Sequence, residues 1–218
     1  MGGNIKPCGR GGADSVSANA ENAKGIFMKK KNEKIMFCRI AWMEKYDGHG
    51  EMTGGGEYVR QNDYGAELYN FYPSSEDGKV YGYARNTREK IYIERLGAAS
   101  GAEKIDGVTV VWAANNPHRE NRFCIVGWYE NATVFRELQV APKSLNRKPP
   151  EGHHCPYNML VVATDATLLP VGKRTKEVPQ ADESTNGFGR ANVWYAEERP
   201  DFVKETMEYI KAWHSSGA

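Results

Sequence analysis

The stretch FCIVGWYENATVFR, residues 123–136, decides the fold predicted for this chain. Its first residues form a continuous apolar run of strand length, which indicates a strand buried on both faces. The run ends in Trp128 and Tyr129 and passes directly into polar Glu130 and Asn131. A flat ring can stack on a nucleobase while a neighbouring amide bonds to the edge of that base. The stretch therefore predicts a central strand that ends in a site for a planar ligand.

Apolar segments on either side of this stretch predict the rest of a curved or closed sheet. Residues 35–43 contain no Gly or Pro, and residues 108–114 form a second continuous apolar run, so both are expected to be buried strands. The polar connection 115–122 would join the second run to the central strand. Shorter strands are expected at residues 66–73, 134–140 and 159–163, and a hairpin from residues 79–84 and 90–95 through residues 85–89.

A helix is predicted near the C-terminus. Pro200 suits a first helical turn, and Val203, Met207, Ile210 and Trp213 recur at helical spacing on one apolar face. This face is expected to cover the sheet, with Trp213 as a core anchor.

Polar and glycine-rich segments set the predicted domain boundaries. Residues 1–33 are rich in Gly, Ala, Asn, Ser and Lys, and this composition cannot bury a core by itself. Residues 47–56 hold five glycines, which suits either a flap that approaches a ligand or an ordinary mobile loop. The predicted organisation is a flexible, basic, glycine-rich tail at residues 1–33, one recognition domain at residues 34–214 and a tail at residues 215–218.

The charge of the chain is nearly balanced. Lys and Arg total 29 against 28 Asp and Glu, which gives a net charge of +1. A polyanion would therefore meet no global attraction, and affinity for nucleic acid would depend on a local basic patch. The residues expected to contact phosphates are Arg39, Arg119, Arg122, Arg136 and Lys143.

Aromatic and amide side chains near strand ends are the candidates for base binding. Trp42 and Tyr46 follow the first apolar run in the same way that Trp128 and Tyr129 follow the central one. Stacking contributes about 1 to 3 kcal/mol per base, so two rings could hold one flipped base. The full set of candidates is Trp42, Tyr46, Tyr69, Asn70, Trp128, Tyr129, Asn131 and Trp194.

Motifs for catalysis, cofactors and membranes are not recognisable in the sequence. It contains no Gly-x-Ser-x-Gly turn, no Gly-x-x-x-x-Gly-Lys loop and no His-Glu-x-x-His helix, so no catalytic residue and no cofactor are predicted. The four cysteines are too widely spread for a zinc pair and are expected to be free thiols, and no metal site is predicted. No long apolar stretch or signal core is present, so we expect a cytoplasmic protein without a membrane partner.

The segments FCRIAWM, GGGEYV, AELYNF, KVYGYA, IDGVTVVW and IVGWYENATVFR, with NVWYA before the terminal helix, carry a resemblance over residues 34–214. The chain resembles the N-terminal specificity domain of prokaryotic modification-dependent restriction endonucleases of the HNH type. Such domains are similar to the PUA-like superfamily, which includes SRA, EVE and YTH modules. The resemblance implies an α+β fold, a curved and partly closed mixed β-barrel with flanking helices. It also implies an aromatic pocket for an extruded modified base and a nuclease on a separate subunit, because no HNH motif is recognisable here.

Three hypotheses for function stay open at this point. The first is a DNA-binding module that recognises a modified base within a restriction or defence system, without catalysis. The second is a metal-dependent nuclease or other hydrolase with an unrecognised site that uses His153 and His154. The third is a PUA-like module for RNA or a free nucleotide, which would distinguish RNA from DNA by contact with the 2′-hydroxyl. The oligomeric state is not predicted.

Overall fold

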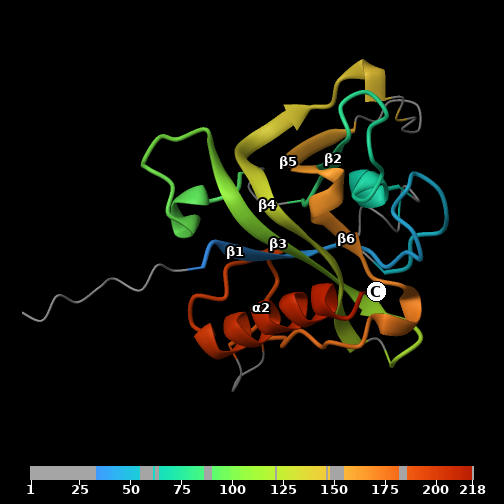
Figure 1. Cartoon of the computed structure of the whole chain (residues 1–218), viewed down its shortest axis with the longest axis vertical. Helices are drawn as coiled ribbons and strands as arrows, with labels where there is room; N and C mark the ends of the chain where they lie inside the picture. The colour runs from blue at the N-terminus through green and yellow to red at the C-terminus, as the bar shows by residue number, and fades with distance from the viewer. Residues whose placement is uncertain are drawn as a thin grey trace, which may run out of the picture. The chain divides into compact units, whose positions relative to one another are not determined.

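Two long strands that contain the central apolar runs form the middle of the sheet (Figure 1). This computed structural model describes residues 33–54, 61, 64–85, 90–120, 122–145, 147, 155–181 and 186–217. The two central strands are β3, Lys104–Asn116, and β4, Arg122–Val140. The two pair antiparallel from the Asn116–Arg122 end to the Lys104–Phe135 end. Both runs were predicted as strands, and each strand extends further than its apolar run. The expected tail at residues 1–33 lies outside the described residues except for Glu33.

The remaining strands complete an α+β fold with a mixed seven-stranded sheet. The strand order is β2-β5-β4-β3-β1-β7, and β6 also pairs with β4. β1 runs parallel to β3, whereas the other pairings are antiparallel. The bounds of these strands are β1 Ile35–Arg39, β2 Lys79–Gly82, β5 Pro156–Val162, β6 Ala166–Leu168 and β7 Val193–Trp194. Five 3-10 helices lie between them in the described part of the chain: η1 Ala66–Tyr69, η2 Ile93–Leu96, η3 Lys143–Leu145, η4 Ala163–Asp165 and η5 Val171–Lys173.

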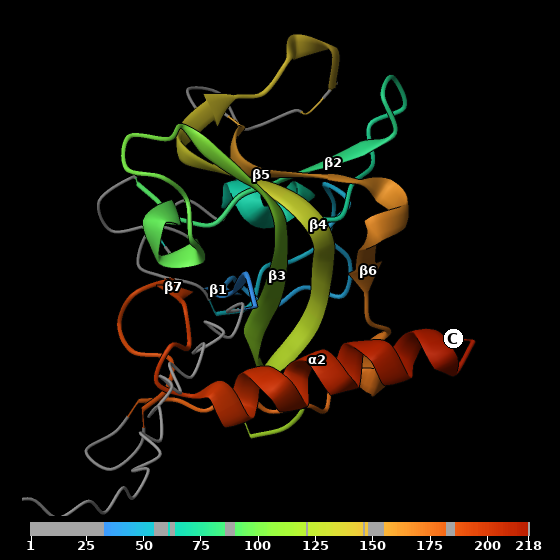
Figure 2. The ribbon, with the colours of Figure 1, turned by 60° about the vertical axis from the view of Figure 1, so that its left-hand side comes forward.

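The predicted C-terminal helix is present as α2 (Pro200–Ser215) and covers one face of the sheet (Figure 2). Phe202, Thr206 and Ile210 are its fully buried residues, while Trp213 is half-buried. We call the covered surface the helix face; its core contains Ile35, Phe37, Val111, Ile125 and Trp128.

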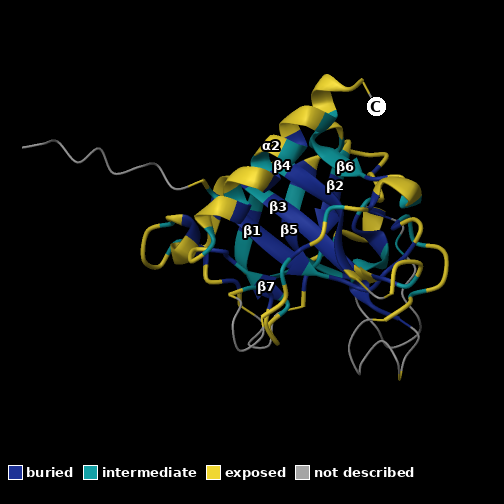
Figure 3. Ribbon diagram, turned by 90° about the horizontal axis from the view of Figure 1, so that it is seen from below, coloured by how far each residue is buried: buried dark blue, intermediate teal, exposed yellow. Residues whose placement is uncertain are grey.

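Loops and 3-10 helices cover the opposite surface, which we call the loop face. Its core contains Met36, Cys38, Val110, Trp112 and Tyr129, each next in sequence to a residue of the helix face. Successive side chains of a strand point to opposite sides, so this alternation places a core on each side of the sheet. The central parts of the strands are accordingly buried, whereas the outer surface of α2 is exposed (Figure 3).

The sheet is not closed into a barrel, so the α+β class is confirmed and the expected partly closed PUA-like barrel is not. β2 and β7 lie at its two ends, and no pairing joins them among the described residues. β7 has only two residues, and Val80 of β2 bridges to Pro73 instead. Register shifts between β3 and β4 supply local twist without bringing the ends together.

The expected hairpin and one expected short strand are wrong. β2 pairs with β5, while Lys90 bridges to Glu137 of β4 and the chain then forms η2. Residues 66–69 form η1 rather than a strand. Tyr69 and Ile93 are nevertheless buried, because these segments cap the loop face with apolar side chains.

Candidate functional site

β4 sends its paired aromatic residues to opposite faces of the sheet. Trp128 is fully buried beneath α2, with its ring centroid 6.0 Å from that of Tyr209 and 6.2 Å from that of Trp213. Tyr129 is fully buried on the loop face, 5.1 Å from Trp112 between ring centroids. The expectation that Trp128 and Tyr129 stack on the same base is therefore corrected: adjacent strand residues cannot share a ligand on one side of the sheet.

Several of the other predicted residues gather on the loop face. The Tyr46 ring lies 5.6 Å from Phe71, which in turn lies 5.5 Å from Tyr129. The Tyr46 hydroxyl donates to the Ala41 carbonyl at 2.8 Å, and Tyr129 donates to the Asn70 carbonyl. Burial raises the pKa of both phenols, so both stay protonated at neutral pH.

The amide of Asn70 is occupied by the backbone of Tyr83. Its Nδ2 donates to the Tyr83 carbonyl at 2.9 Å, and its Oδ1 accepts from the Tyr83 N–H at 2.8 Å. Asn70 is fully buried and fixes η1 against the segment after β2. The expected contact between this amide and the edge of a base is therefore corrected to a structural role.

Trp42 also has a structural partner. The Arg174 guanidinium lies 4.8 Å from the centroid of the Trp42 ring. Arg174 is itself buried and donates to the carbonyls of Leu169, Met43 and Glu44 at 2.9, 2.5 and 2.7 Å. This arginine covers one face of Trp42 and fixes the chain after β1.

Asn131 and Trp194 lie away from the loop-face group. Asn131 is exposed, has a φ of 54° and places Nδ2 3.5 Å from Oδ2 of Asp165. Trp194 stacks on Phe202 of α2 with centroids 6.0 Å apart. The structure therefore does not bring the eight predicted base-binding residues together at one site.

An arginine that sequence analysis did not select completes the most distinctive polar group of the loop face. The centre of the Arg147 guanidinium lies 5.1 Å from the Tyr69 ring and 5.7 Å from the Tyr81 ring, and Nη2 donates to the Tyr81 carbonyl at 2.7 Å. Tyr64 and Cys155 join this group, with 3.3 Å between the hydroxyl oxygen and the sulfur. We call the group formed by Arg147, Tyr64, Tyr69, Tyr81, Tyr129 and Cys155 the Arg147 cluster.

Arg147 lacks both a counter-charge and a full set of hydrogen-bond acceptors within this cluster. Its Nε and Nη1 atoms are buried without a hydrogen-bond partner, and among the residues that the structure describes no carboxylate forms an ion pair with it. Burial lowers the pKa of Arg147, while Cys155 and the nearby tyrosines oppose this effect. Buried donors without acceptors are costly, so the cluster is suited to a ligand that brings oxygen or nitrogen acceptors.

The predicted phosphate-binding residues do not form one patch. Arg122 is paired with Glu177 at 3.0 Å, and Arg136 is paired with Glu94 at 2.7 Å. Arg119 and Lys143 are exposed, and neither side chain forms an ion pair with a carboxylate among the residues described by the structure. Arg39 has a different environment, because its guanidinium lies against two aromatic rings.

The described residues contain no cluster of three His, Cys, Asp or Glu side chains that could hold a metal ion. His153 and His154, on which the hydrolase hypothesis rested, lie outside the described residues. None of the helices in the described part of the chain has the length and apolar character needed to span a bilayer. Comparisons of the chain with protein-family models, with curated proteins and with solved structures find no match.

Proposed function

We propose that this chain is a nucleic-acid-binding module that holds one base, extruded from its strand, at the Arg147 cluster. One observation carries the proposal: a guanidinium that lies over two tyrosine rings keeps two buried nitrogen donors without acceptors in the described structure. Arginine and tyrosine supply the two interactions that proteins use on unpaired bases, namely stacking on the ring and hydrogen bonds to its edge.

The chemistry of the cluster favours an acceptor-rich base. Guanidinium groups bond well to the O6 and N7 atoms of guanine and to carbonyl or anionic oxygen on a modified base. The Tyr69 and Tyr81 rings both lie against the guanidinium, so a planar group bound there would meet an aromatic surface as well as a donor.

The wider setting of the proposal comes from the sequence resemblance. We infer a PUA-like recognition domain of a restriction or defence system that recognises a modified DNA base and depends on a separate nuclease subunit. The α+β class, the mixed sheet and the C-terminal helix against one face support this setting.

Binding of labelled duplexes by Arg147→Gln tests this proposal. The duplexes carry cytosine, 5-methylcytosine, 5-hydroxymethylcytosine, 5-carboxycytosine, adenine or N6-methyladenine at one position and are compared at one fixed salt concentration. A hydrogen bond to a charged group contributes about 1.5 to 3 kcal/mol, so we expect Arg147→Gln to weaken binding of the preferred duplex about 10- to 100-fold. Binding to the other duplexes should change less.

Two variants control for charge and folding. Arg190→Gln removes the same charge from an exposed arginine and should leave selectivity unchanged, while Arg147→Lys keeps the charge and loses the planar donor group. Thermal melts establish that each variant is folded. Equal selectivity in wild type and in folded Arg147→Gln would contradict the proposed site. If the wild-type protein prefers single-stranded RNA or a free nucleotide to every duplex, that molecule and not DNA is the ligand.

A further inference from the structure

Arg39, at the end of β1, packs its guanidinium against two phenylalanine rings. Its guanidinium centre lies 4.9 Å from the centroid of Phe123 and 5.1 Å from that of Phe188. The two rings are 5.1 Å apart between centroids and nearly perpendicular, at 83°. The side chain of Arg39 therefore keeps little of the rotamer freedom that a surface arginine has.

Both rings are themselves fixed. Phe123 is buried at the start of β4, opposite Asn115 of β3. Phe188 is buried, and backbone hydrogen bonds join it to Pro179 and Ala181 at 2.8 and 3.0 Å.

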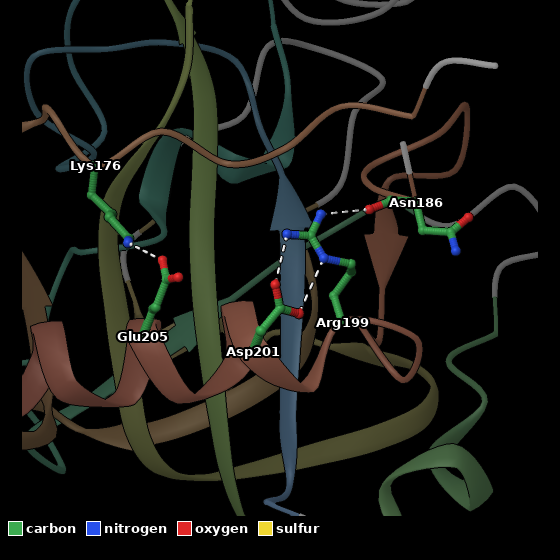
Figure 4. Close-up of polar contacts among 5 residues, drawn as sticks. All are labelled: Lys176, Asn186, Arg199, Asp201 and Glu205. Atoms are coloured by element: carbon green, nitrogen blue, oxygen red, sulfur yellow. Dashed lines mark hydrogen bonds and ion pairs between the residues drawn. The ribbon is translucent and has the colours of Figure 1, made fainter. Parts of the chain in front are cut away.

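Polar contacts fasten the segment that carries Phe188 to α2 (Figure 4). Arg199 donates to the Asn186 carbonyl at 3.1 Å and makes two hydrogen bonds to Asp201, and Lys176 pairs with Glu205 at 2.9 Å. Phe188 thus lies two residues after the Asn186 attachment to Arg199 and is itself hydrogen-bonded to Pro179 and Ala181, so the fold fixes the ring against which the Arg39 guanidinium packs.

The charge of Arg39 has no counterion in the described structure. No carboxylate there pairs with it, and burial lowers its pKa without an opposing acidic neighbour. Nε is buried without a hydrogen-bond partner, whereas the terminal nitrogens are not enclosed in this way. Arg190, two residues after Phe188, and Arg119, which follows β3, add exposed positive charge on neighbouring segments.

We propose that Arg39 is a pre-organised contact for a backbone phosphate of the bound nucleic acid, on a surface separate from the Arg147 cluster. The inference rests on the proposed function. A guanidinium that is already fixed and uncompensated loses little entropy on binding an anion, and arginine is well matched to phosphate oxygen. A phosphate contact strengthens binding to every sequence and carries no base preference.

The salt dependence of binding distinguishes this role from base recognition. We expect Arg39→Gln to reduce the slope of log affinity against log salt by about 0.9, the value for one phosphate contact on duplex DNA. At about 0.1 M salt this corresponds to roughly eightfold weaker binding, by the same factor for modified and unmodified duplexes. Arg39→Lys should keep most of the slope, because it keeps the charge.

Arg95 provides a matched control. It also lies over an aromatic ring, 4.2 Å from the Tyr195 centroid, but it is paired with Glu197 at 2.7 Å. Arg95→Gln should leave the salt slope unchanged. If folded Arg39→Gln binds with the wild-type slope and affinity, the phosphate contact is overturned and the base site stands. If the wild-type chain binds no nucleic acid at all, the proposed function itself fails.

Discussion

Trp128 illustrates at the scale of one residue how burial decides the role of an aromatic ring. It is fully buried on the helix face, in contact with Tyr209 and Trp213 of α2. We expect Trp128→Ala to lower the free energy of unfolding by about 3 to 5 kcal/mol, because it leaves a large cavity beneath the helix. Urea denaturation followed by far-UV circular dichroism measures this loss.

The same variant separates packing from recognition. Under conditions where Trp128→Ala is still folded, its selectivity among duplexes should equal that of the wild type, because the ring lies on the face opposite the Arg147 cluster. A folded variant that loses selectivity while keeping wild-type stability would show that Trp128 takes part in base recognition.

Candidate residues were predicted from the sequence by residue type and by proximity to strand ends, and this criterion had limited reach. Tyr69 and Tyr129 do lie in the Arg147 cluster. Asn70 could not be recognised as structural, because its partner Tyr83 belongs to a segment whose approach depends on tertiary packing. Arg147 stands in a polar connection rich in Lys and Pro, where no periodicity distinguishes it from a surface arginine.

At the scale of the element, α2 carries an uncompensated hydroxyl. Thr206 is fully buried, and its Oγ1 has no hydrogen-bond partner in the described structure. Thr206→Val has nearly the same shape and removes a buried polar group, so we expect it to raise the free energy of unfolding by about 1 kcal/mol. Urea unfolding measures the change, with a Thr→Val substitution at exposed Thr175 as the control. A destabilised Thr206→Val variant would show that the hydroxyl has a partner in solution.

Elements with a strong local signal were predicted well. The runs in β3 and β4 are long, apolar and free of Pro, and α2 has a helical repeat that begins at Pro200. The segments 66–73 and 79–95 alternate Tyr with polar residues, a pattern that suits a strand and equally suits a 3-10 turn that caps a core. Their structure depends on contact with the loop face, and the local sequence pattern does not contain that information. For the same reason the open edges of the sheet could not be predicted.

The packing of β6 against β4 explains why position 127 is glycine. A Cβ atom there would lie 2.3 Å from the carbonyl oxygen of Thr167, in β6, and 2.7 Å from the Phe71 ring. The close approach of β6 to β4 therefore requires glycine in the middle of the apolar run.

At the scale of the whole molecule, buried tyrosines set the response to alkaline pH. Burial is the largest cause that raises the pKa of Tyr195 to about 12 from an ordinary value of 10.0, and it raises the pKa of Tyr46 and Tyr129 as well. The folded state thus holds these protons more tightly than the unfolded state. Their contribution to stability is complete below about pH 10 and falls as the pH rises toward about 12.

Urea unfolding at intervals from about pH 9 to about pH 12 checks this expectation. Each such tyrosine can reduce the free energy of unfolding by up to about 1.4 kcal/mol per pH unit within that window. Tyr195→Phe should show a shallower decline than the wild type, and Tyr72→Phe, at an exposed position, should not. Parallel declines in the wild type and Tyr195→Phe would contradict the assignment.

The position of β1 has a consequence for synthesis on the ribosome. β1 lies between β3 and β7, with Phe37 opposite both Val111 and Trp194. The β3–β4 hairpin needs only nearby residues and can form while the chain is still emerging, whereas β1 is made first and finds its second neighbour only when residues 193–194 appear. The apolar segment 35–38 is therefore a nascent strand with at least one unpaired edge for most of translation, and unpaired apolar edges of this kind favour aggregation.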